Sequence, residues 1–195
     1  MARQCEFDSE QVLDKAMHLF WKKGYNATSM AELEKGMGIN KFSIYNSFGN
    51  KHQLFLAVLN HYAEKKLGQM LDLLNASPRG LAAIERVLDL LETIVSESSE
   101  QAGCLMLSSG TELSLHDADV SNKVRRVNRY LEDAFYQALL DAQKKGEISA
   151  HLDLKDYSRF LVSLYQGMMT VAKNEQDTLT VLSSIRFTRL MLHKL

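Results

Sequence analysis

The sequence predicts an all-α protein of about nine helices, in which a small N-terminal three-helix domain precedes a larger helical domain. The chain has 195 residues with a single proline and ten glycines, so little in it would interrupt long helices. Apolar residues recur at spacings of three and four, and the sequence lacks the alternating β-branched runs that strands would need. With 46% hydrophobic residues, the chain can form one substantial core and a smaller second one.

The first predicted helix follows Asp8 and ends at Gly24. Asp8 is suited to cap its first turn, while Lys22 and Lys23 complement the negative end of the helix dipole. Its expected apolar stripe consists of Val12, Leu13, Ala16, Leu19 and Phe20. We expect this helix to support the two shorter helices that follow.

Residues 28–54 predict two short helices joined by a tight turn, with another helix directly after them. Ser29 and Glu32 have the spacing of a capping box, so a helix begins there. This helix would present Met30, Leu33 and Met37 on one face. Gly38 can take the positive φ that ends a helix, and Asn40 can cap the next helix.

The helix after Asn40 would bury Ile44 and Phe48, which are four residues apart, and leave a polar face exposed. That face carries Lys41, Ser43, Asn46 and Ser47. Two short helices with a glycine turn and a polar second helix are the outline of a helix-turn-helix DNA-binding motif.

The later elements are predicted from helical spacing and cap residues. A fourth helix begins near Asn50 and presents Leu54, Phe55, Val58, Leu59 and Tyr62 on one side. We expect this connection to end in the region 68–80, with Pro78 near the start of the next helix. The further elements are a helix over 81–95, a short interrupted segment over 103–115, a long helix from Val120 to Ala138 closed by Gly146, and helices over 154–172 and 178–193 capped by Asp153 and Asp177.

The last two predicted helices are apolar around much of their circumference. A surface helix of a monomer would expose a polar face instead, so we expect these helices to pair with a second copy of the chain. The sequence therefore predicts a homodimer.

One set of residues resembles the N-terminal signature of the TetR family of transcriptional regulators. The set comprises Gly24-Tyr25, Thr28-Ser29-Met30, Gly38-Ile39-Asn40-Lys41, Ser43-Ile44-Tyr45, Phe48, Lys51 and Leu54-Phe55. Sixteen positions at fixed spacing make this match far more specific than a lone motif. Gly103-Cys104-Leu105 with Glu112-Leu113 resembles a segment of the C-terminal domains of some of these regulators. Glu34 and Phe42 depart from the usual small residues at their positions.

The resemblance implies a DNA-binding repressor that binds double-stranded, palindromic operator DNA as a homodimer and is released by a small apolar effector. It implies a DNA-binding domain over 1–52 and an effector-binding and dimerisation domain over 53–195. The implied DNA-binding residues are Thr28, Ser29, Asn40, Lys41, Phe42, Ser43, Tyr45, Asn46, Ser47 and Lys51. Of these, Tyr45 and Lys51 would contact phosphates, whereas Lys41, Ser43 and Asn46 would contact bases.

Seven residues of the larger domain are candidates to surround the effector: Cys104, Leu105, Met106, Phe135, Tyr165, Met168 and Met169. Methionines adapt to the shape of a ligand, but such residues suit an ordinary core equally well. Cys104 could sense oxidants or electrophiles, although a cysteine among apolar residues is usually inert packing. With Cys5 it fits the reduced thiols of an intracellular protein.

Charge and motif content narrow the functional classes. The net charge is −1, and residues 1–51 carry seven basic and six acidic side chains, so DNA binding would depend on the placement of cations. No phosphate loop, nucleophile elbow or metal-ligand spacing is present, and we expect no enzyme, cofactor or metal site. No run of eighteen apolar residues or export signal occurs, which favours a cytoplasmic protein without membrane contact. The alternative is a dimeric small-molecule or redox-sensing protein that does not act through DNA.

Overall fold

The computed structural model describes residues 8–97, 103–174 and 177–194, and all regular elements in these ranges are helices. The helices are α1 (Ser9–Lys23), α2 (Met30–Met37), α3 (Lys41–Phe48), α4 (Lys51–Tyr62), η1 (Ala63–Leu67), α5 (Gly68–Asn75), α6 (Leu81–Glu97), α7 (Leu105–Leu113), α8 (Ala118–Lys144), α9 (Leu154–Asn174) and α10 (Thr178–Leu192). The π-helical segment η1 joins α4 to α5 without a break, so these described elements form nine separate helices. The predicted all-α class is therefore confirmed.

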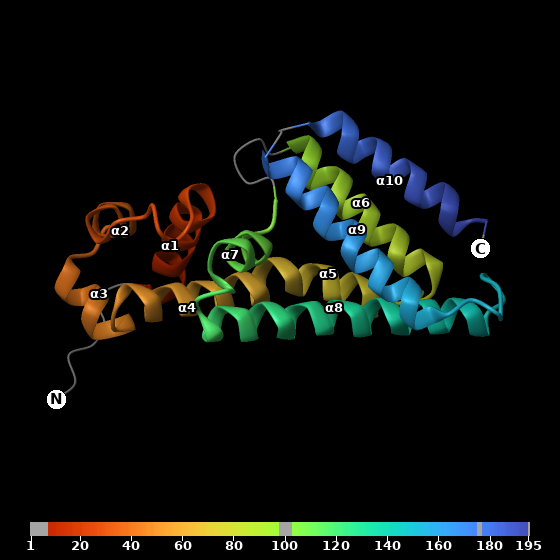
Figure 1. Cartoon of the computed structure of the whole chain (residues 1–195), viewed down its shortest axis with the longest axis horizontal. Coiled ribbons are helices and arrows are strands. Elements are labelled where there is room, and N and C mark those ends of the chain that lie inside the picture. Colours follow the sequence, from red (N-terminus) through yellow and green to blue (C-terminus); the bar gives the residue numbers. More distant parts are fainter. Residues whose placement is uncertain (1–7, 98–102, 175–176, 195) are drawn as a thin grey trace.

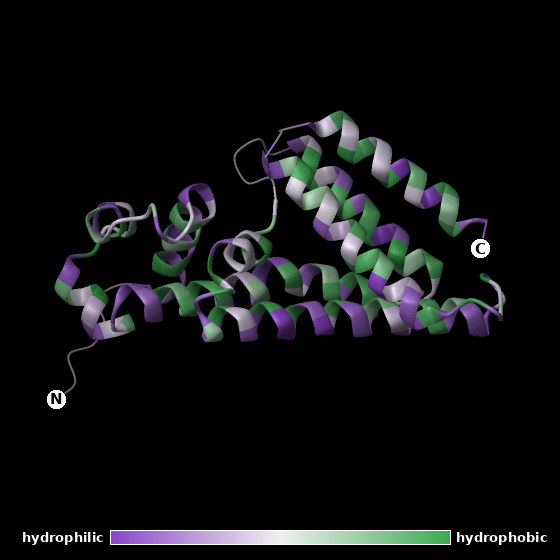
Figure 2. Cartoon of the chain, in the orientation of Figure 1, coloured by the Kyte–Doolittle hydropathy of each residue, from purple (hydrophilic) through white to green (hydrophobic). Residues whose placement is uncertain are grey.

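The helices are arranged along one long axis (Figure 1). The α4–η1–α5 helix and α8 run side by side along that axis, with α1, α2 and α3 grouped at one end. At the other end α6, α9 and α10 pack as a tilted layer, and α7 lies between the two groups. In Figure 2 α8 alternates between hydrophilic and hydrophobic bands, as expected for a helix with one buried face.

The predicted helix ends in the N-terminal region are confirmed. Asp8 caps α1 by accepting hydrogen bonds from the backbone N–H groups of the first turn. Ser29 and Glu32 form the reciprocal capping box of α2, and Gly38 ends that helix with φ of 74°. Asn40 caps α3 through a 2.8 Å hydrogen bond from the Ser43 N–H to its side-chain oxygen.

The buried face of α1 is wider than the predicted stripe. Met17 and Trp21 are buried, whereas Leu13 and Leu19 are only half-buried. The reason is that α1 packs against α2, α4 and α7 at once, so more of its circumference is covered than one neighbouring helix would cover.

The α4–η1–α5 helix ends at Asn75, within the predicted region 68–80. Gly68 adopts helical φ and ψ of −53° and −45°, and the chain stays helical to Asn75. A glycine inside a helix costs about 1 kcal/mol, which the burial of the flanking side chains Leu67 and Met70 can outweigh. Pro78 precedes α6 by three residues rather than beginning it, and the first turn of α6 is capped by Glu147, which accepts from the Leu81 N–H at 2.8 Å.

The remaining helices follow the predicted pattern closely. Asp117 caps α8 and Gly146 follows its end with φ of 72°, while Asp153 and Asp177 cap α9 and α10. The segment around 103–115 contains the regular helix α7. Across the described ranges, every helix is too short or too polar to cross a membrane.

Candidate DNA-binding surface and effector cavity

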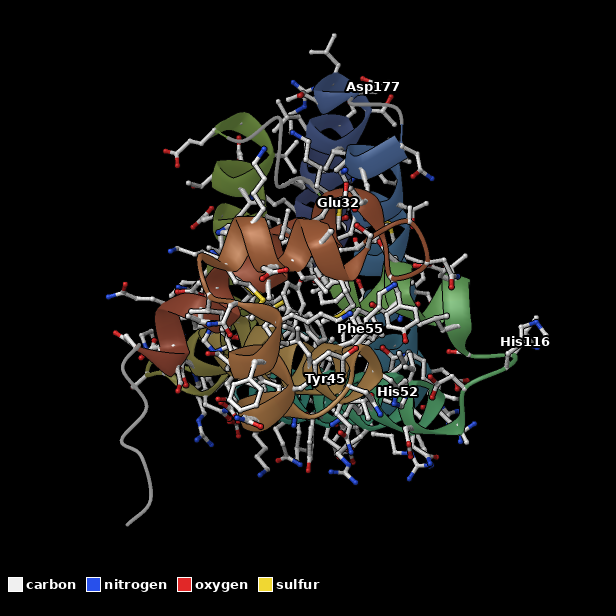
Figure 3. All side chains as sticks on the ribbon, turned by 90° about the vertical axis from the view of Figure 1, so that its left-hand side faces the viewer. Glu32, Tyr45, His52, Phe55, His116 and Asp177 are labelled. Carbon is white, nitrogen blue, oxygen red and sulfur yellow. The ribbon has the colours of Figure 1, made fainter. Side chains whose placement is uncertain are left out.

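The short helix α3 exposes one side at the end of the molecule formed by α1, α2 and α3. Phe42 is 71% exposed and Tyr45 44% exposed, whereas Ile44 between them is fully buried. Lys41, Asn46 and Ser47 are also exposed. In Figure 3 Tyr45 lies on the outside of this end, while Phe55 lies between the helices. We call Lys41, Phe42, Tyr45, Asn46 and Ser47 the recognition surface.

Side chains of α2 and of the turn after it hold the N-terminus of α3. The Lys41 N–H donates to Glu34 Oε1 at 3.0 Å, and the Ser43 N–H donates to Asn40 Oδ1 at 2.8 Å. Glu34, one of the two departures from the usual pattern, therefore acts as a cap for α3. The other departure, Phe42, places a large apolar ring in solvent beside this helix start.

Lys51 begins α4 and lies against an aromatic ring. Its Nζ is 4.3 Å from the centroid of the Tyr25 ring, a cation–π distance. Burial lowers the pKa of the Lys51 amine, and the negative charges of Glu112 and Glu32 oppose that effect. The sequence suggested a phosphate-bound lysine, but it did not suggest Tyr25 as its support.

Thr28 is a correction to the predicted DNA-binding residues. Its side chain is fully buried, and its hydroxyl donates to the Gly24 carbonyl at 2.6 Å. A buried hydroxyl that is already bonded inside the protein cannot reach a partner, so Thr28 holds the turn between α1 and α2. Ser29, by contrast, is exposed at the start of α2, and Asn40 is exposed at the start of α3.

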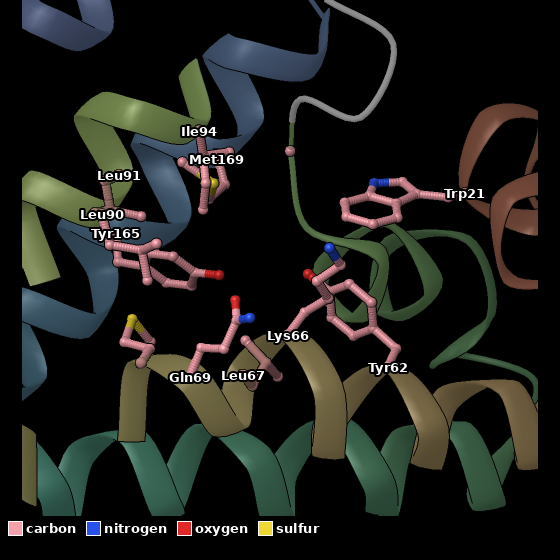
Figure 4. A pocket seen from close by; sticks show the side chains of 12 residues that line it. Trp21, Tyr62, Lys66, Leu67, Gln69, Leu90, Leu91, Ile94, Tyr165 and Met169 are labelled. Atoms are coloured by element: carbon pink, nitrogen blue, oxygen red, sulfur yellow. The ribbon is translucent and has the colours of Figure 1, made fainter. Parts of the chain in front are cut away.

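A cavity of about 110 Å³ lies between α1, the α4–η1–α5 helix, α6 and α9. Figure 4 shows Trp21 and Tyr62 on one side of it, facing Tyr165, Met169, Leu90 and Leu91 on the other. The complete lining is Trp21, Tyr62, Lys66, Leu67, Gln69, Met70, Leu90, Leu91, Ile94, Gly103, Tyr165 and Met169. The walls are mainly apolar and aromatic.

A few polar groups are placed around this cavity. The indole Nε1 of Trp21 is buried and has no hydrogen-bond acceptor among the described residues. The Trp21 and Tyr62 rings meet edge to face with centroids 5.1 Å apart. Burial, and then the neighbouring Cys104, raises the pKa of the Tyr62 and Tyr165 hydroxyls well above the ordinary value, so both remain neutral hydrogen-bonding groups.

All seven predicted effector residues are buried, but they do not surround one cavity. Tyr165 and Met169 line the 110 Å³ cavity, and Cys104 with Met169 lines a second cavity of about 340 Å³ beside α7. Met106 lines a third, of about 280 Å³, between α4 and α8. Leu105, Phe135 and Met168 line none of these three and are core residues.

The most informative residue that sequence reasoning missed is Trp21. It is the only tryptophan of the chain and lies at the end of the first helix, more than a hundred residues before Tyr165. Only the tertiary packing of α1 on α4 and α7 brings it to the cavity. In the sequence, the only indication of a special role for Trp21 is that tryptophan occurs once.

The outer sides of α9 and α10 expose large apolar side chains. Phe160 is 41% exposed, Leu179 75%, Phe187 64% and Leu190 58%. Within α9, Gly167 is exposed between the half-buried Leu164 and Val171, which leaves room for close approach of another helix. These faces agree with the predicted pairing of two copies.

One group of possible metal ligands occurs in the described ranges. His52, Asp117 and Asp119 bring their ligand atoms within 4.8 Å of one another. His52 Nε2 and Asp117 Oδ2 are already 2.7 Å apart, and Asp117 also accepts from two N–H groups as the cap of α8. The contact thus joins the start of α4 to the start of α8.

The sequence matches two family profiles and several known transcriptional regulators. Residues 12–58 match the bacterial regulatory proteins of the tetR family, and residues 80–186 match the tetracyclin repressor-like C-terminal domain. The HTH-type transcriptional repressor ComR of Escherichia coli (strain K12) is 32% identical over 187 residues, which cover 95% of this chain and 89% of that protein. YezE of Bacillus subtilis (strain 168), an HTH-type transcriptional regulator, is 30% identical over 178 residues, covering 91% and 92%.

Solved structures share the fold at lower identity. A cysteine variant of the TetR family regulator CifR, in complex with a 26 bp operator DNA, has a TM-score of 0.84 at 23% identity, with 95% of this chain and 97% of that chain covered. A TetR family regulator from Agrobacterium tumefaciens has a TM-score of 0.82 at 20% identity, with 95% and 96% covered.

Proposed function

The chain belongs to the TetR family of bacterial transcriptional regulators, and from this membership we propose a repressor that binds a palindromic operator as a homodimer and is released by a small apolar effector. It is a DNA-binding regulator and not an enzyme. The observation that carries the proposal is the recognition surface of α3, where polar side chains and two exposed aromatic rings, Phe42 and Tyr45, flank the buried Ile44 along the helix. The alternative of a binding protein that does not act through DNA gives this surface no role.

The proposed DNA contacts divide into two groups. Tyr45 and Lys51 bind phosphates, which position the protein without selecting sequence. Lys41, Phe42, Ser43 and Asn46 approach base edges in the major groove, where the Phe42 ring suits the methyl group of thymine. Ser29, Asn40 and Ser47 lie at the edge of this surface and contact the sugar-phosphate backbone of the DNA.

The proposed homodimer forms through the outer faces of α9 and α10. Burying four exposed apolar side chains, Phe160, Leu179, Phe187 and Leu190, removes them from water and favours association. A twofold dimer presents two recognition surfaces to successive major grooves, so the half-sites lie roughly 34–36 Å or a multiple apart. Two pairs of helices, α9 and α10 from each copy, then form a four-helix interface.

The proposed effector binds in the 110 Å³ cavity of the domain that we assign to 53–195, against Trp21 from the domain assigned to 1–52. An apolar cavity of about 150 Å³ can hold benzene, so this smaller one admits at most a single ring unless its walls move. The unbonded Trp21 Nε1 favours a compound with one hydrogen-bond acceptor. Binding there displaces α1 against α4 and changes the separation of the two recognition surfaces, which lowers DNA affinity. Because a bacterial repressor must reach the chromosome, we place this protein in the cytoplasm.

A single titration series tests these proposals. Operator affinity of the wild-type protein is measured against a panel of small aromatic compounds with and without an acceptor group, and the oligomeric state is followed by light scattering. We expect a folded dimer and a roughly 5- to 150-fold loss of operator affinity with a fitting compound. A folded monomer at micromolar concentration contradicts the dimer, and compounds that bind without changing operator affinity contradict the effector switch.

Leu90→Trp sharpens this test. Leu90 is half-buried at the cavity wall, so a larger side chain there fills the cavity without replacing a residue of the fully buried core. We expect the effector response to disappear while operator affinity stays unchanged. Leu115→Trp is the matched control, because Leu115 is 90% exposed and lines none of the cavities described above.

A further inference from the structure

The second half of the Gly103-Cys104-Leu105 and Glu112-Leu113 motif contacts the DNA-binding domain directly. Glu112 lies near the end of α7, and its carboxylate accepts two backbone hydrogen bonds from the turn between α1 and α2. The Tyr25 N–H donates to Oε2 at 2.9 Å, and the Asn26 N–H donates to Oε1 at 2.7 Å. Hydrogen bonds to an ionised carboxylate are stronger than those to neutral acceptors.

The chain before Tyr25 is shaped to let this carboxylate approach. Gly24 has φ of 80°, a conformation that other residues rarely adopt. A Cβ atom at this position would lie 2.8 Å from Glu112 Oε2. The backbone conformation therefore favours glycine here, and a larger residue would displace the Glu112 carboxylate.

The residue held by Glu112 also supports the proposed phosphate contact. The Tyr25 ring packs on Phe55 with centroids 4.8 Å apart, and Lys51 Nζ lies 4.3 Å from the Tyr25 centroid. A shift of the Tyr25 backbone would move this ring and the cation above it. The path from Glu112 through Tyr25 to Lys51 consists of direct contacts only.

The first half of α7 is tied to the effector domain. Lys173 of α9 donates to the Ser108 hydroxyl at 2.9 Å and to the Trp21 carbonyl at 3.1 Å. A Cβ atom at Gly103, which lines the proposed effector cavity, would lie 2.6 Å from the Lys173 Cβ. Gly103 of the cavity wall thus lies just before α7, and Glu112 near the other end of α7 contacts the DNA-binding domain.

We infer that Glu112 is a positioning residue for DNA binding, which holds the turn at Tyr25 and Asn26 and thereby sets Lys51 against the operator phosphate. A movement of α7 at the cavity changes this contact and transmits the effector signal. The inference rests on the proposed function for its link to DNA, whereas the contact between Glu112 and the turn can be tested without DNA.

Two variants and one control test the inference. Glu112→Ala removes both acceptors, and Glu112→Gln keeps the shape but offers one carbonyl oxygen for two N–H donors. Glu64→Gln is the matched control, since it removes the same charge from an exposed position of η1. Each protein is compared with wild type by amide hydrogen exchange at Tyr25 and Asn26 and by operator titration over a range of salt.

We expect faster exchange at both amides and about 10-fold weaker operator binding for Glu112→Ala, with a smaller loss for Glu112→Gln. The salt slope should fall by about one because Lys51 no longer meets its phosphate. In a Lys51→Ala background, Glu112→Ala should weaken binding much less, because the two residues act on one contact. A purely structural role would leave the two effects additive.

Unchanged exchange at Tyr25 and Asn26, or faster exchange with operator affinity and salt slope equal to those of Glu64→Gln, overturns the inference. Additive losses in the double variant also overturn it. If the wild-type protein binds no duplex, the proposed function fails, and amide exchange still decides whether Glu112 holds the turn.

Discussion

The recognition surface and the effector cavity differ in how the chain builds them. The recognition surface comes from a single stretch of eight residues, α3, whose N-terminus is held by neighbours within seven positions, Asn40 and Glu34. The cavity takes its walls from α1, the α4–η1–α5 helix, α6 and α9, which are spread over most of the chain. The surface is thus encoded locally, whereas the cavity exists only once the fold is complete.

The two regions also differ in whether the same side chains serve both stability and binding. On α3 the residue that holds the helix, Ile44, is buried, and the residues that face a partner are exposed, so each task has its own side chains. In the cavity, Trp21 and Tyr165 belong to the core and would also touch the effector. Substitutions should therefore separate the two properties on α3 and mix them in the cavity.

The largest expected effect is the loss of the buried support of α3. Ile44→Ala removes a fully buried side chain beneath the recognition surface, and we expect a loss of roughly 2–5 kcal/mol in the free energy of unfolding. Asn46→Ala, two positions along the same helix and exposed, should change stability by less than about 0.5 kcal/mol. Urea unfolding of both variants measures this contrast. Equal losses would mean that α3 does not separate support from recognition.

The local character of α3 also explains what could be predicted from the sequence. Asp8, Ser29, Gly38 and Asn40 lie within four residues of the backbone groups they cap, so their roles follow from spacing alone. The end of the α4–η1–α5 helix could be predicted only as the region 68–80, because Gly68 stays helical through packing against α6 and α8, which local propensity does not contain.

The DNA-contact residues could likewise be predicted from the sequence better than the effector residues. Nine of the ten predicted DNA-contact positions are at least partly accessible, and only Thr28 is buried, because its hydroxyl closes the turn onto Gly24. Only Tyr165 and Met169 of the predicted effector residues line the 110 Å³ cavity. The periodicity that marks a buried residue cannot tell which buried residues border empty space.

The next effect concerns which bases the protein prefers. Lys41→Ala and Asn46→Ala should each cost about 1–3 kcal/mol at particular operator positions and leave other positions unchanged, since bidentate base contacts carry sequence information. Binding of each variant to a set of operators with single base-pair changes measures this. Losses that are uniform across the set would show that these side chains do not read bases.

Smaller, sequence-independent losses are expected from the proposed phosphate contacts. Lys51→Ala should weaken binding to every duplex by a similar factor and lower the salt slope by about one. Tyr45→Phe removes a neutral hydroxyl and should weaken binding without changing the slope. Measuring affinities at several salt concentrations separates the two. A change of base preference in either variant would place that residue among the base contacts.

The smallest expected effect tests whether cavity residues combine core and effector roles. Trp21→Phe keeps an aromatic ring against Tyr62 but removes the buried Nε1, which has no acceptor in the described residues. An unbonded buried donor destabilises the unliganded protein, so its removal offsets part of the loss of packing, and we expect a small net loss of stability. A compound with an acceptor group should bind about 0.5–1.5 kcal/mol more weakly, and the same ring without an acceptor should bind equally well. Calorimetry with such a matched pair of compounds measures the difference. If both compounds lose affinity equally, Trp21 acts only through its shape, and the cavity selects its effector without a hydrogen bond from the indole.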